Sequence, residues 1–75
     1  MVNKMKTEIT LSDIEDDMTN KEALAFFGKE LWDKISPQLK YNTCSMNAKG
    51  YLVNYRHDLQ NALHKVRTGK AMFWD

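Results

Sequence analysis

The chain has 75 residues, of which 43% are apolar and 28% are charged, and its formal net charge is +1 at pH 7. A chain of this length forms one small domain, which buries about 60% of the surface that the unfolded chain exposes. Cys44 is the only cysteine, which excludes an intramolecular disulfide and is typical of a reducing compartment. Neither a secretory signal nor an apolar stretch of about 20 residues is present, so we expect a cytoplasmic protein with no membrane contact.

Residues 1–11 are expected to form an arm that is either flexible or a β-strand. Residues 5–11 alternate between one face with Met5, Ile9 and Leu11 and an opposite polar face, and a period of two is typical of strands. The sequence contains no second strand, so such a strand would pair with another molecule. Ser12 to Glu15 follows the capping-box pattern, which predicts a short acidic helical turn.

A second capping box, Thr19 to Glu22, predicts the start of a long helix over residues 20–35. Pro37 ends this helix because proline cannot continue the hydrogen-bond ladder. Phe26 and Trp32 lie off the main apolar stripe of the helix, so either the same chain covers several of its sides or a patch is left for a partner. The stripe itself consists of Leu24, Phe27, Leu31 and Ile35.

Residues 38–46 are expected to connect this helix to a second long helix over residues 47–68. Gly69 suits the left-handed position that follows a helix C-terminus. The apolar stripe of the second helix consists of Ala48, Leu52, Tyr55, Leu59, Ala62, Leu63 and Val66. The predicted fold is therefore mainly α, with residues 1–75 forming a single small domain in which two long helices pack as an antiparallel-like pair.

The charges divide unevenly between the two halves of the chain. Residues 1–38 contain five lysines and eight acids, net −3, whereas residues 39–75 contain six basic residues and two acids, net +4. On the predicted second helix, four polar residues form one flank, which we call the basic ridge. This ridge is a solvated surface, or it binds an acidic protein, nucleic-acid phosphates, or the acidic segment 13–17 of its own chain. Its members are Lys49, Arg56, Gln60 and Arg67, and His64 and His57 lie beyond them on the helix.

Catalytic, cofactor-binding and metal sites are not predicted. His57 and His64 are seven residues apart, about 10 Å along a helix, whereas a chelating pair needs the spacing i, i+4. Nothing in the sequence places Cys44 beside His57 as a nucleophile with its base. We therefore expect a protein that is not an enzyme and binds no cofactor.

The segment after Gly69 is unusually apolar, because Met72, Phe73 and Trp74 follow one another. Terminal residues are poorly ordered unless something holds them. One interpretation is that the three side chains fold back onto the first long helix near Phe26 and Trp32. The other is that they anchor a partner.

The leading functional hypothesis is a small non-enzymatic protein–protein interaction module, a regulator or inhibitor that docks on a larger intracellular protein, of the kind that phages and mobile elements carry. A homodimer is compatible with this hypothesis. The alternative is a dimeric nucleic-acid-binding regulator that uses the basic ridge. Large apolar side chains and arginine are enriched at interfaces. The residues expected to bind the partner are Phe26, Trp32, Lys49, Arg56, Gln60, His64, Arg67, Met72, Phe73 and Trp74.

Overall fold

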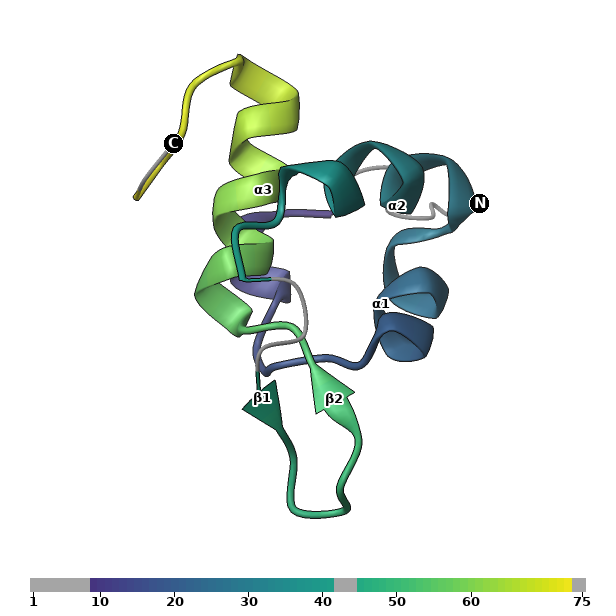
Figure 1. Ribbon diagram of the computed structural model, residues 1–75. Helices are drawn as coiled ribbons and strands as arrows, with labels where there is room; N and C mark the ends of the chain where they lie inside the picture. The colour runs from purple at the N-terminus through teal and green to yellow at the C-terminus, as the bar shows by residue number, and fades with distance from the viewer. Residues whose placement is uncertain (1–8, 42–44, 74–75) are drawn as a thin grey trace.

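The computed structural model describes residues 9–41 and 45–73. It is a compact, mainly helical domain with a short β-hairpin, and α3 forms one side of the molecule while α1 and α2 form the other (Figure 1). The mainly α fold class is thus confirmed, but the two long helices are not. The elements are η1 (Leu11–Asp13), α1 (Asn20–Phe27), α2 (Lys29–Ile35), η2 (Ser36–Gln38), β1 (Ser45–Met46), β2 (Leu52–Val53) and α3 (Arg56–Thr68).

The helix predicted over residues 20–35 is divided at Gly28 into α1 and α2. Gly28 adopts φ 87° and ψ 153°, a combination that is essentially restricted to glycine. Its amide donates to the Leu24 carbonyl at 2.9 Å, and its carbonyl accepts the Trp32 amide at 2.8 Å, so it caps both helices. The predicted capping box at Thr19 is confirmed by its two reciprocal hydrogen bonds with Glu22, and α2 ends before Pro37 as expected.

The second predicted helix begins at Arg56 rather than at residue 47. Residues 45–53 instead form an antiparallel hairpin in which Met46 pairs with Leu52. Asn47 closes its turn, because the Asn47 side-chain oxygen accepts the amides of Lys49 and Tyr51 at 2.9 and 3.1 Å. Gly50 has φ 88° in this turn, a value that an L-residue rarely adopts. The C-terminal end of this helix is as predicted, because Gly69 follows it in the left-handed conformation at φ 79°.

The N-terminal expectations are met in part. The expected arm falls mostly on residues 1–8, which lie outside the described residues, and residues 9 and 10 are not a strand. The short helical turn is the 3₁₀ helix η1, and its capping box runs from Thr10 to Asp13 rather than from Ser12 to Glu15. Farther along, Met18 forms an isolated antiparallel bridge with Asn54, which joins this segment to the end of the hairpin.

The core lies where α3 meets α2 and the N-terminal segment. The stripe predicted on α3 supplies its centre, because Leu59, Ala62 and Leu63 are fully buried. Leu24 was expected in the core and is 41% exposed, because the bend at Gly28 turns α1 relative to α2. The other buried apolar core residues are Ile14, Ala23, Phe27, Ile35 and Leu39. None of the helices in the described ranges has the length and apolar character to cross a membrane.

Candidate functional site

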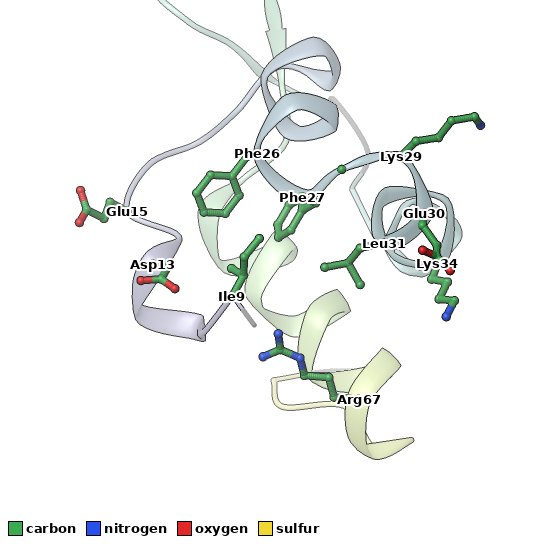
Figure 2. Close-up of a pocket in the computed structure, with 11 residues that line it drawn as sticks. Ile9, Asp13, Glu15, Phe26, Phe27, Lys29, Glu30, Leu31, Lys34 and Arg67 are labelled. Atoms are coloured by element: carbon green, nitrogen blue, oxygen red, sulfur yellow. The ribbon is translucent and has the colours of Figure 1, made fainter. Parts of the chain in front are cut away.

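An open groove of about 910 Å³ lies between the segment around η1, the bend that joins α1 to α2, and the C-terminal half of α3. Figure 2 shows four apolar side chains gathered at its centre, Ile9, Phe26, Phe27 and Leu31, with charged side chains around them. We call these four residues the groove floor. The charged residues that line the groove are Asp13, Glu15, Lys29, Glu30, Lys34 and Arg67.

The bend at Gly28 builds the groove floor. On a continuous helix, residues five apart point about 140° away from each other, but here the Trp32 ring stacks on the Phe27 ring, with centroids 6.1 Å apart and an interplanar angle of 4°. The Phe26 ring meets the edge of Phe27 at 5.0 Å. Phe27 is thus buried while Phe26 stays 36% exposed above it, which leaves an aromatic face open to a ligand.

The two edges of the groove differ in charge. Asp13 and Glu15 lie on one side, and Lys29, Glu30 and Lys34 of α2 lie on the other (Figure 2). The Asp13 carboxylate accepts the Thr10 amide at 2.8 Å, so it has a structural role. The groove therefore offers an apolar floor with both signs of charge within reach.

The three cations that line the groove differ in whether they form an ion pair. Lys29 pairs with Asp33 at 3.0 Å on the exposed face of α2. Within residues 9–41 and 45–73, neither Lys34 nor Arg67 forms an ion pair. These two cations are therefore available to an anionic group of a ligand.

The predicted basic ridge does not form. Lys49 lies in the hairpin turn, away from α3. The Arg56 side-chain Nε donates to the Ile14 carbonyl at 2.9 Å, and the Arg56 amide donates to the Asp17 carboxylate at 2.7 Å. Gln60 is buried, and its amide nitrogen donates to the Leu11 carbonyl at 2.9 Å.

Arg56 and Gln60 thus hold the N-terminal acidic segment against α3. Of the three partners considered for the basic ridge, the structure shows these two residues in contact with the N-terminal segment of their own chain. His64 is half-buried, and its carbonyl accepts the Thr68 hydroxyl at 2.9 Å. Arg67 alone among the predicted ridge residues lines the groove.

The segment after α3 returns along the side of α3 that faces away from α1 and α2 (Figure 1). The Met72 and Phe73 amides both donate to the side-chain oxygen of Asn61, at 2.8 and 2.6 Å. Their side chains remain 44% and 51% exposed. Packing of Met72 and Phe73 near Phe26 and Trp32, one of the two interpretations from the sequence, is therefore wrong, and Trp74 lies outside the described residues.

Two buried polar residues of α3 have structural roles that were not predicted from the sequence. Asp58 is fully buried and accepts the amides of Lys40 and Tyr41, each at 2.9 Å. Asn61 is 1% exposed and holds the segment after α3. In the sequence, each is a polar residue beside the apolar stripe of the helix. Polar residues that face solvent occur at such positions too, so the pattern does not show that these two are buried.

An aromatic cluster lies where the connector reaches α3. The rings of Tyr55 and His57 stack at 5.5 Å, and Tyr41 meets Tyr55 edge to face at 5.6 Å. Because the rings face one another, they form a packed junction between the connector and α3. In the described part of the chain, no three His, Cys, Asp or Glu side chains are placed to hold a metal ion, and Cys44 lies outside that part.

Comparisons with known proteins give no further guide to this site. No protein-family model matches the sequence, and no curated protein or solved structure matches it. The groove is therefore interpreted from its own geometry and chemistry.

Proposed function

We propose that the protein is a small non-enzymatic interaction module, a regulator or inhibitor, that docks on a larger cytoplasmic protein through the groove. The observation that carries this proposal is the exposed aromatic floor at the bend between α1 and α2. The Phe26 ring is 36% exposed beside the buried Phe27, and aromatic anchors of this kind dominate the binding energy of protein interfaces.

The occupant of the groove is an apolar segment of the partner that carries acidic side chains. Its apolar residues cover the groove floor, and its carboxylates meet Lys34 and Arg67, which form no ion pair in the described residues. Charge at the edge of an apolar contact chiefly sets orientation and association rate. The apolar contact supplies most of the affinity.

Nucleic-acid binding, the alternative hypothesis, depended on the basic ridge. Lys49 is separated from α3, and Arg56 and Gln60 are engaged with the N-terminal segment. Because the remaining cations are dispersed, no observation favours this function over protein docking.

The test compares two substitutions on the same helix. Phe26→Asp places a charge on the groove floor, whereas Leu24→Asp changes a residue of similar exposure, 41% against 36%, that does not line the groove. A photoreactive amino acid at position 30, which also lines the groove, cross-links the chain to whatever occupies the groove in cells. We expect one larger protein to be cross-linked by the parent chain and by Leu24→Asp, and to be lost with Phe26→Asp.

Equal cross-linking in both variants would contradict the proposal, and so would the absence of any cross-linked protein. Circular dichroism of each variant checks that the fold is retained. Both positions are exposed, so both variants are expected to fold.

A further inference from the structure

Asn61 presents the two residues Met72 and Phe73, which we call the tail pair, as a preorganised apolar element. Asn61 is 1% exposed, and its side-chain oxygen accepts both backbone amides of the tail pair, at 2.8 and 2.6 Å. The backbone is thereby fixed while the side chains stay 44% and 51% exposed. Fixing a segment before it binds lowers the conformational entropy that binding costs.

The tail pair and the groove are complementary in chemistry. A methionine and a phenylalanine match the floor of Ile9, Phe26, Phe27 and Leu31, because thioether and aromatic groups pack well on aromatic rings. The sequence continues with a further aromatic residue and Asp75. Asp75 follows Phe73 by two positions in the sequence, and its charge is opposite to that of Lys34 and Arg67 on the edge of the groove.

The tail pair cannot enter the groove of its own chain while Asn61 holds it. The groove lies between α3 and the bend that joins α1 to α2, whereas the tail pair lies on the side of α3 that faces away from α1 and α2 (Figure 1). The two surfaces can therefore meet only between different molecules.

We propose that the groove of one molecule binds the tail pair of a second copy of this chain. The inference rests on the proposed function, because it treats the groove as a docking site, and it identifies the occupant of the groove in the isolated protein. A larger partner with an acidic apolar segment then competes with the second copy for the same groove. Self-association would thus hold the groove closed until that partner displaces it.

The contact is heterologous, because two different surfaces of each molecule meet. The two surfaces lie on different sides of α3, and head-to-tail contacts of this kind form rings or open chains rather than an isologous dimer. The average molar mass should therefore rise with concentration beyond that of two copies.

Sedimentation equilibrium over concentrations from about 10 μM to about 1 mM, suited to a contact of a few side chains, tests this proposal. The parent chain and Leu24→Asp should associate, whereas the tail variant Met72→Ser/Phe73→Ser and the groove variant Phe26→Asp should each remain monomeric. A mixture of these two variants should form a 1:1 complex, because one retains the groove and the other retains the tail pair. Arg67→Glu, a second groove variant at an exposed position, should weaken association at least 5-fold.

A parent chain that stays monomeric would overturn the proposal. Association that survives in the tail variant, or a variant mixture that stays monomeric while the parent associates, would also overturn it.

The proposed function has a separate readout. If the parent chain is monomeric but Phe26→Asp still abolishes cross-linking to a larger protein, self-docking fails and the proposed function stands. If self-association follows the expected pattern but no larger protein is cross-linked, the proposed function fails.

Discussion

The substitution Gly28→Ala should change both the stability and the shape of the domain. Gly28 has φ 87° and ψ 153° between α1 and α2, and an added Cβ would meet no atom within 4 Å. Its effect therefore comes from backbone conformation alone. This substitution tests how the groove is formed, because the bend at Gly28 brings the Phe27 ring against the Trp32 ring and leaves Phe26 exposed.

The expected magnitude follows from two contributions. An L-residue in this essentially glycine-only region costs about 1–3 kcal/mol. In a continuous helix over the same residues, alanine is favoured over glycine by about 1 kcal/mol. The balance between the bent and the continuous helix thus shifts by about 2–4 kcal/mol toward the continuous form. Straightening would separate the Phe27 and Trp32 rings, which now stack at 6.1 Å, so the bent fold should be destabilised by about 1–3 kcal/mol.

Urea denaturation measures the loss of stability, and the carbon chemical shifts of residues 26–30 report whether the helix becomes continuous. Gly69→Ala is the matched control, because Gly69 also has positive φ and no atom within 4 Å of an added Cβ. At its left-handed φ of 79° and ψ of 2° it should cost about 1–2 kcal/mol without altering residues 26–30. Stability of Gly28→Ala within 0.5 kcal/mol of the parent chain, with unchanged shifts, would refute this account of the bend.

Three further substitutions test the packing that supports the site. Asp58→Ala removes the acceptor of two loop amides and should cost about 2–4 kcal/mol in urea denaturation; a cost below 1 kcal/mol would contradict its structural role. Leu63→Ala opens a cavity at a fully buried position and should cost about 2–5 kcal/mol, which thermal unfolding measures. Gln60→Met keeps the length of the side chain but removes its hydrogen bond to the Leu11 carbonyl, which ties the N-terminal segment to α3, so amide exchange in residues 11–17 should accelerate while exchange in α2 stays unchanged.

The sequence predicted the features that local chemistry determines. The capping box at Thr19, the helix end before Pro37 and the left-handed Gly69 each depend on residues within one helical turn, and all three are confirmed. The apolar stripe over residues 59–63 also identified the centre of the core, because a period of 3.6 is unambiguous there.

The two glycines within the predicted helices, Gly28 and Gly50, interrupt those helices, which the sequence did not predict. Glycine costs a helix only about 1 kcal/mol, so Gly28 and Gly50 were compatible with continuous helices on propensity alone. Side-chain contacts, one set tertiary and one local, favour the broken conformations. At Gly28 the break allows Trp32 to stack on Phe27, and at Gly50 the amides around the turn are satisfied by Asn47.

The candidate site was harder to predict than the elements, because its residues come from distant parts of the chain. Of the ten residues expected to bind a partner, Phe26 and Arg67 line the groove, whereas Arg56 and Gln60 hold the N-terminal segment. A helical wheel shows which residues share a face. It does not show which of those faces the same chain will cover.

We propose that the exposed aromatic floor of the groove binds a partner protein. The most direct test of this proposal is titration calorimetry of the cross-linked partner, once purified, with the Phe26→Asp and Leu24→Asp variants. Loss of an aromatic anchor at an interface costs at least about 2 kcal/mol, or about 30-fold in affinity. We expect this loss for Phe26→Asp and parent-like affinity for Leu24→Asp. Equal affinity of the two variants would contradict it.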